Sequence, residues 1–213
     1  MIWMKALLQL LSLNLMQPIV LALTGASALQ LGEKAIELLL NSNYNVYLIL
    51  SKGAYEVFKS ERGINIPIDP IKQERYWRDR FNISTGYLKC HKWNDHSSSI
   101  ASGSFITKAM VIVPCTMGTI GRISSGYSLD LIERCADVHL KENRPLLLVP
   151  RESPLSIIHL RNLISLAEAG AKIIPPIPSW YSKPNDLDEM INFIVVRMFD
   201  SLGINLGTIN RWK

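Results

Sequence analysis

Short apolar runs alternate with segments of helical periodicity along most of this chain. The apolar runs predict strands at 18–24, 44–50, 110–114, 146–150 and 172–175. The periodic segments predict helices at 28–41, 51–62, 116–126, 128–142, 155–169 and 187–202. Such alternation is typical of a mostly parallel sheet covered by helices on both faces. We therefore expect a single α/β domain with a doubly wound, flavodoxin- or Rossmann-like sheet.

Two segments depart from this rhythm. Residues 63–104 hold a polar helical stretch and then a serine-rich stretch, which we interpret as an insertion or an active-site loop. The first sixteen residues combine Lys5 with an apolar run that lacks a small-residue cleavage pattern and is too short to span a bilayer. We expect an N-terminal extension over 1–17, a domain over 18–213, no membrane span and a cytoplasmic location.

Composition narrows the classes of function. The chain has 213 residues and a net charge of +5, from 23 basic and 18 acidic residues that are scattered rather than clustered. Nucleic-acid binding therefore has little support. The three cysteines form no CxxC motif, and the four histidines lack the spacing of zinc ligands. We expect a reducing compartment, no disulfides and no metal site.

One charged stretch, residues 134–152, surrounds an apolar strand. Arg134 and Lys141 are two helical turns apart, and Arg151 and Glu152 follow the strand's carboxyl end. Open α/β sheets bind ligands at that end. The pattern favours a phosphorylated small molecule with a nearby acid or base. An ordinary surface of solvated charges is the alternative.

Small and hydroxylated residues follow three of the predicted strands. They are TGAS from Thr24, Ser51, and PCTMGT from Pro114. Small residues let the backbone approach a ligand, and a following helix N-terminus offers N–H groups to an anion. Dinucleotide and P-loop signatures are missing, so the three loops indicate a mononucleotide across the strand ends. Flavin mononucleotide (FMN) fits a crevice of that size.

Several ordered motifs resemble one family, the UbiX-type flavin prenyltransferases. They are TGAS, LSKGA, SGSF, MVIVPCTMGT, RCADVHLKENRPLLLVPRESPLSIIHLRN and PPIPSWY, with a terminal Arg211–Trp212 pair. The resemblance implies a metal-independent transfer of a dimethylallyl group from dimethylallyl monophosphate to N5 and C6 of reduced FMN. The product would serve a UbiD-type decarboxylase, with ubiquinone biosynthesis as a common setting. It also implies a homo-dodecamer whose active sites lie at subunit interfaces.

The resemblance also implies a set of site residues. It assigns FMN contacts to Gly25, Ala26, Ser27, Ser51, Thr116, Met117, Gly118, Thr119 and Arg151. It assigns the prenyl-phosphate site to Arg134, Lys141, Tyr181, Arg197 and Trp212. Catalysis falls to Ser27, Glu61, Glu152 and Lys141. In this scheme Glu152 protonates the leaving phosphate, Ser27 and Glu61 relay flavin protons, and fixed cations stabilise the charge on the departing phosphate.

The chain departs from the family pattern at a few positions. Ala28 stands where a glycine is usual, which narrows the backbone choices of the first loop. Trp180 replaces a phenylalanine, and His96 takes the place of a tryptophan that some relatives carry. Two other functions stay open. One is an FMN-dependent peptidyl-cysteine or phosphopantothenoylcysteine decarboxylase recruiting His91 or His96, and the other is a non-catalytic FMN carrier.

Overall fold

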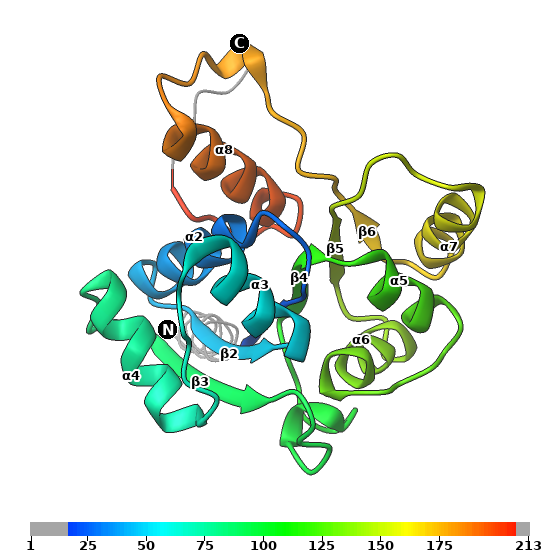
Figure 1. Cartoon of the computed structure of the whole chain (residues 1–213). Helices are drawn as coiled ribbons and strands as arrows, with labels where there is room; N and C mark the ends of the chain where they lie inside the picture. Colours follow the sequence, from blue (N-terminus) through cyan, green and yellow to red (C-terminus); the bar gives the residue numbers. More distant parts are fainter. Residues whose placement is uncertain (1–16, 208–213) are drawn as a thin grey trace, which may run out of the picture.

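The computed structural model describes residues 17–207 and shows a six-stranded, fully parallel sheet in the order β3-β2-β1-β4-β5-β6 (Figure 1). The strands are β1 Ile19–Leu23, β2 Asn45–Leu50, β3 Tyr87–Lys92, β4 Ala109–Cys115, β5 Leu146–Pro150 and β6 Lys172–Ile173. All residues of β1, β4 and β5 are buried. Their nearly unbroken apolar sequences follow from burial on both faces of the sheet.

Helices cover both faces of this sheet. The helices are α2 Leu29–Asn41, α3 Lys52–Arg62, α4 Pro70–Phe81, α5 Met117–Ser124, α6 Leu131–Lys141, α7 Ile157–Glu168 and α8 Leu187–Asp200. Two 3₁₀ turns, η1 Ser99–Ala101 and η2 Trp180–Ser182, lie in the connections. One core joins the sheet to α2, α3, α4 and α8, and a second joins it to η1, α5, α6 and α7. The doubly wound fold is therefore confirmed.

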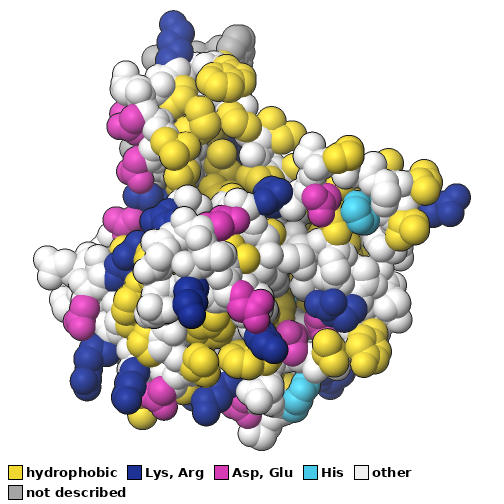
Figure 2. Space-filling model, viewed as in Figure 1, with side chains coloured by type: hydrophobic (Ala, Val, Ile, Leu, Met, Phe, Trp, Pro, Cys, Tyr) yellow, Lys and Arg dark blue, Asp and Glu magenta, His cyan; other side chains and the backbone are white. Residues whose placement is uncertain are grey.

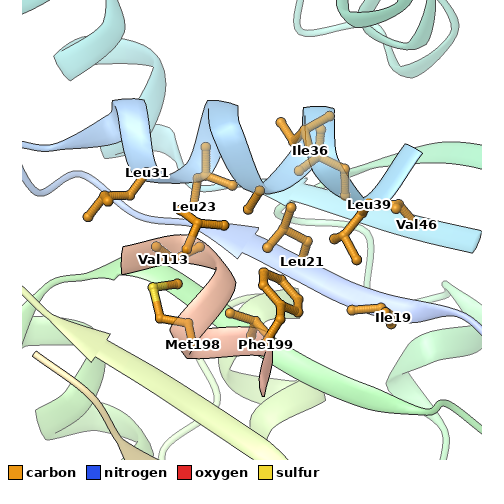
Figure 3. Packing of buried hydrophobic residues seen from close by; sticks show 14 of the residues in the cluster. Ile19, Leu21, Leu23, Leu31, Ile36, Leu39, Val46, Val113, Met198 and Phe199 are labelled. Carbon is orange, nitrogen blue, oxygen red and sulfur yellow. The ribbon is translucent and has the colours of Figure 1, made fainter. Parts of the chain in front are cut away.

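The first core attaches α2 and α8, the two helices beside the candidate site, to the sheet. Figure 3 shows Leu21 and Leu23 of β1 between α2 and the end of α8. Leu39 packs from α2, and Met198 and Phe199 pack from α8; all three are fully buried. Burying a side chain of this size contributes about 2 kcal/mol, so α2 and α8 are firmly attached to the sheet.

The prediction that residues 63–104 form an insertion or an active-site loop is wrong, because this segment contributes a strand to the sheet. Its strand β3 pairs in parallel with β2, from Asn45↔Tyr87 to Leu50↔Lys92. Tyr87, Lys89 and Lys92 are exposed on this edge strand, whereas Leu88 and Cys90 are buried. Exposed lysines protect a sheet edge from further pairing, and they also interrupt the apolar run that would have indicated a strand.

Between residues 17 and 207, no helix is long and apolar enough to cross a membrane.

Candidate active site

Thr24 ties together the carboxyl ends of β1 and β4. Its buried hydroxyl donates to the carbonyl oxygen of Pro114 at 2.8 Å and accepts from the Thr116 backbone N–H at 2.8 Å. The Thr24 N–H also donates to Pro114 O, at 3.1 Å. These bonds fix the relative height of the first and third predicted ligand loops. Thr24 was predicted only as part of the TGAS loop and not as a site residue, although a threonine that ends an apolar strand is the signal that could have found it.

The first and second ligand loops touch through two glycines. A Cβ on Gly25 would lie 2.8 Å from the carbonyl carbon of Gly53, which real side chains essentially never do. A Cβ on Gly53 would lie 3.3 Å from the Cα of Gly25. The two backbones therefore approach as closely as only glycine permits. Gly53 was also missed, even though it follows Ser51 in the conspicuous LSKGA motif.

Two helices begin at this edge of the sheet with hydroxyl caps. Ser51 Oγ accepts from the N–H of Ala54 at 3.1 Å, and Thr116 Oγ1 accepts from the N–H of Thr119 at 3.1 Å. The caps leave other N–H groups of α3 and α5 directed toward the loops, as an anion site requires. Met117 is buried in the second core, so only its backbone is available to a ligand.

Ser27, Glu61 and Arg151 meet beside these loops. The Ser27 hydroxyl donates to Glu61 Oε2 at 3.0 Å, although the two residues are 34 positions apart. Arg151 Nε donates to the backbone oxygen of Ser27 at 3.4 Å. A serine, a carboxylate and a guanidinium, all predicted as site residues and far apart in the sequence, are thus brought together. The hydroxyl and carboxylate can pass a proton, and the cation can hold an anion.

Ala28 turns the chain from this cluster into α2. It is the N-cap of α2 and has φ 78 and ψ 33, the left-handed conformation. A residue with a Cβ pays for that conformation, which explains why glycine is usual there. Ala28 keeps the turn despite the substitution, and Ser27 still reaches Glu61.

An apolar groove of about 370 Å³ starts at this cluster and runs between α2 and α8. Ser27, Ala28 and Arg151 form one end, and Gln30, Leu31, Pro176, Leu187, Met190, Ile191 and Ile194 form the walls. Figure 2 shows hydrophobic side chains gathered in the hollow beside α8. The sequence predicted a helix over 187–202 but not this wall.

Tyr181 and Arg197 lie on the arm made by η2 and α8. The ring of Tyr181 packs edge-on against Phe193, with centroids 5.7 Å apart. Phe193 is one helical turn before Arg197, so the two predicted donor-site residues share one side of α8. Arg197 also pairs with Asp200 at 3.5 Å. Glu152 is exposed after β5, and its Oε1 accepts from the backbone N–H of Ser153 at 3.1 Å.

Arg134 and Lys141 lie on α6, as predicted. Within a single copy of the chain, however, they do not form one cluster with Arg151. Arg134 donates to the carbonyl of Ala101 at 3.1 Å and pairs with Asp137 at 2.8 Å. Lys141 is the exposed last residue of α6. Because α6 runs into the amino end of β5, Lys141 lies at the opposite edge of the sheet from Arg151. The expected cluster of cations at one strand end is therefore incomplete within a single copy.

The remaining sequence predictions concern the terminal Arg211–Trp212 pair, metal ligands and a catalytic histidine. Trp212 and Arg211 lie outside the described residues. No group of three potential metal ligands occurs between residues 17 and 207. His91 is buried, which lowers its pKa to about 4, and its Nδ1 pairs with the Ser98 hydroxyl at 2.9 Å. It is therefore neutral at physiological pH and far from the form a general acid requires.

Comparison with known proteins agrees with this geometry. The profile of the Flavoprotein family matches residues 11–199. Flavin prenyltransferase UbiX of Synechocystis is 44% identical over 198 residues, covering 92% of this chain and 96% of the relative. UbiX of Pseudomonas aeruginosa is 38% identical, covering 91% and 93%.

Solved structures show the same likeness. AnUbiX in complex with FMN and dimethylallyl pyrophosphate superposes with a TM-score of 0.81 at 38% identity, covering 92% of this chain and 97% of that one. A dodecameric FMN-dependent UbiX-like decarboxylase from Escherichia coli gives 0.79 at 33% identity, covering 92% and 99%. The loops, the Ser27–Glu61 pair and these relatives together lead to one conclusion: the chain belongs to the Flavoprotein family and, within it, to the UbiX flavin prenyltransferases.

Proposed function

We propose that this chain transfers a dimethylallyl group from dimethylallyl monophosphate to reduced FMN. The observation that carries the proposal is the Ser27–Glu61 hydrogen bond beside Arg151, at the mouth of an apolar groove. That arrangement combines a proton relay, an anion contact and a wall for a hydrocarbon chain. A carrier of FMN would need no such relay.

The loops fit FMN as the cofactor. Gly25 and Gly53 let the first two ligand loops meet backbone to backbone, and the α5 N-terminus with Thr116 and Thr119 suits the FMN phosphate. Arg151 stands at the same edge as a counter-charge. When bound, reduced FMN supplies the N5 and C6 positions that accept the prenyl group.

Ser27 and Glu61 can hold and move protons. The exposed Glu61 carboxylate accepts from the half-buried Ser27 hydroxyl, so a proton released near Ser27 Oγ has a base within 3.0 Å. Glu152 is exposed and directly follows Arg151, which lines the groove, and a carboxyl group there can give a leaving phosphate its proton. A Glu152→Gln variant with the single-turnover rate of the unmodified chain would remove Glu152 from that role.

The donor phosphate requires cations that one copy does not bring together. Tyr181 and Arg197 stand on the arm near the groove, whereas Lys141 lies across the sheet. We propose that a neighbouring copy supplies Arg134 and Lys141, completing the site and excluding water from the allyl cation. Exposed apolar side chains support such packing, since Ile157, Ile158 and Ile164 of α7 are each more than half exposed. The dodecamer of the Escherichia coli relative is the assembly we expect.

The decisive experiment is anaerobic incubation with reduced FMN and dimethylallyl monophosphate, followed by mass spectrometry of the extracted flavin. A gain of one dimethylallyl unit supports the proposal. Flavin recovered unmodified, despite tight binding, would contradict it and favour a carrier.

A second experiment tests the shared site. Lys141→Ala and Arg197→Ala chains should each be inactive as purified oligomers. Unfolding and refolding them together should restore part of the activity, because some sites then combine an intact Lys141 from one copy with an intact Arg197 from another. No recovery in mixed oligomers would place both residues in a site formed by one copy.

The product requires a consumer. We propose that prenylated FMN passes to a UbiD-type decarboxylase in the cytoplasm. The three cysteines described by the structure are buried free thiols, which fits a reducing compartment. Adding a purified UbiD-type apo-decarboxylase to the reaction should yield decarboxylase activity that depends on this chain.

A further inference from the structure

Glu33 is a buried carboxylate that joins three helices next to the site. It lies on α2 and is 6% exposed. Its Oε1 accepts from Arg80 Nε at 2.8 Å and lies 2.7 Å from Arg80 Nη2. Its Oε2 lies 3.3 Å from Arg62 Nη2. Arg80 comes from α4 and Arg62 is the last residue of α3, so one carboxylate connects α2, α3 and α4.

The helix α3 needs such a connection at its carboxyl end. Only Ala54 and Phe58 are buried among its eleven residues, and neither lies in the last turn. Its beginning is held by the Ser51 cap and by the Gly25–Gly53 contact. Its last turn, which carries Glu61, is followed at once by the left-handed Gly63. The Arg62–Glu33 ion pair is therefore a strong tie between that turn and α2.

The same two helices determine where Glu61 and Ser27 meet. Ser27 leads into the N-terminus of α2, and Glu61 lies in the last turn of α3. The 3.0 Å hydrogen bond between them joins a half-buried and an exposed side chain, and such a bond holds its geometry poorly on its own. An ion pair with a buried partner, one residue further along α3, keeps the two helices in register. An error of about 1 Å in such a position is enough to slow a reaction a hundredfold.

We infer that Glu33 and Arg62 are positioning residues, which hold Glu61 against Ser27 for the proton transfer. The inference rests on the proposed function, in which Ser27 and Glu61 act as the relay. Neither residue was singled out by sequence motifs. Arg62 acts through the α3 backbone, whereas Arg80 holds the same carboxylate from α4, a different helix from the one that bears Glu61.

The test compares Arg62→Gln with the matched control Arg80→Gln, in oligomers reconstituted with reduced FMN. Each variant takes one guanidinium from the same carboxylate, so both should lower the melting temperature. Only Arg62→Gln should slow single-turnover prenylation, by roughly ten- to a hundredfold. Arg62→Lys keeps the charge and should recover part of that loss. Hydrogen exchange should rise at the last turn of α3 in Arg62→Gln and stay lower there in Arg80→Gln.

A double variant separates positioning from general damage. In a Glu61→Gln background, Arg62→Gln should change the rate by less than about twofold, because its effect passes through Glu61. Its full effect in that background, or equal slowing by Arg80→Gln, would overturn the inference. A Glu61→Gln rate equal to that of the unmodified chain would also overturn it while leaving the prenyl transfer intact. An unmodified chain that never prenylates FMN would instead refute the proposed function.

Discussion

The two sides of the site are built in different ways. The flavin side consists of the loops after β1, β2 and β4, which are fixed by Thr24, by the Gly25–Gly53 contact and by helix caps. The donor side consists of exposed Glu152 and Arg197, with Lys141 at the far edge of the sheet. The contacts that shape the flavin side all lie within one copy, whereas the donor side, in the function proposed above, is completed by a second copy. Variants can break or sharpen this contrast.

The largest effect is expected at Gly25. Gly25→Ala would place a methyl group 2.8 Å from the Gly53 backbone, which has no flexible side chain to move aside. Overpacking of this kind costs about 3 kcal/mol. We therefore expect a large loss of unfolding free energy by chemical denaturation, and at least tenfold weaker FMN binding by flavin fluorescence. The control, Gly53→Ala, meets its neighbour at 3.3 Å and should lose less of both quantities. A Gly25→Ala chain that kept both its stability and its FMN affinity would show that the contact does not set the loops.

Thr24 should come next. Thr24→Val preserves shape but leaves the Thr116 N–H without its acceptor and removes the donor to Pro114. An unpaired buried N–H costs about 2 kcal/mol, measured as unfolding free energy. Thr24→Ser keeps the hydroxyl and should restore most of that loss. If Thr24→Val matched the unmodified chain, the tie between β1 and β4 would be dispensable for the flavin side.

The sequence predicted these two sides unequally. The buried strands and the hydroxyl-ended loops follow from apolar runs and cap residues, so most elements agree with their predicted bounds to within a few residues. The edge strand β3 was missed because its lysines hide the alternation. The groove wall on α8 and the Glu33 ion pairs depend on contacts between helices far apart in the chain, which no local pattern reports. Lys141 was expected beside Arg151 because the two residues are close in the sequence. They flank β5, however, so they lie at opposite ends of that strand.

His139 fixes the helix that carries two donor-side cations. Its Nδ1 meets the Cys135 carbonyl at 2.7 Å and its Nε2 meets the Thr107 hydroxyl at 2.8 Å. Burial lowers its pKa to about 4, so the unfolded chain, with a pKa near 6.5, binds more protons between those values. Stability should therefore fall as pH drops through that window, by about 2 kcal/mol from pH 7 to pH 5 for this residue.

The measurement is chemical denaturation at pH 7 and pH 5. His139→Gln should be less stable than the unmodified chain at pH 7 but should lose less on acidification. A pH dependence unchanged in His139→Gln would assign the acid sensitivity to other groups. As acidification destabilises α6, the prenylation rate should fall more steeply than the affinity for FMN, because α6 bears Arg134 and Lys141 of the donor side.

The smallest expected effect concerns Ala28, at the join between the two sides. Ala28 holds φ 78 with a Cβ, and left-handed backbone costs about 1 kcal/mol for such a residue. Ala28→Gly removes that cost, but a glycine backbone loses more conformational entropy on folding than an alanine backbone. We therefore expect a net gain of about 0.5 kcal/mol in unfolding free energy. The control Ala26→Gly, at a residue without positive φ, should destabilise the chain instead. The prenylation rate of Ala28→Gly should stay near that of the unmodified chain, because Ser27 already reaches Glu61. A faster rate would mean that the strained turn holds the Ser27 hydroxyl away from its best position.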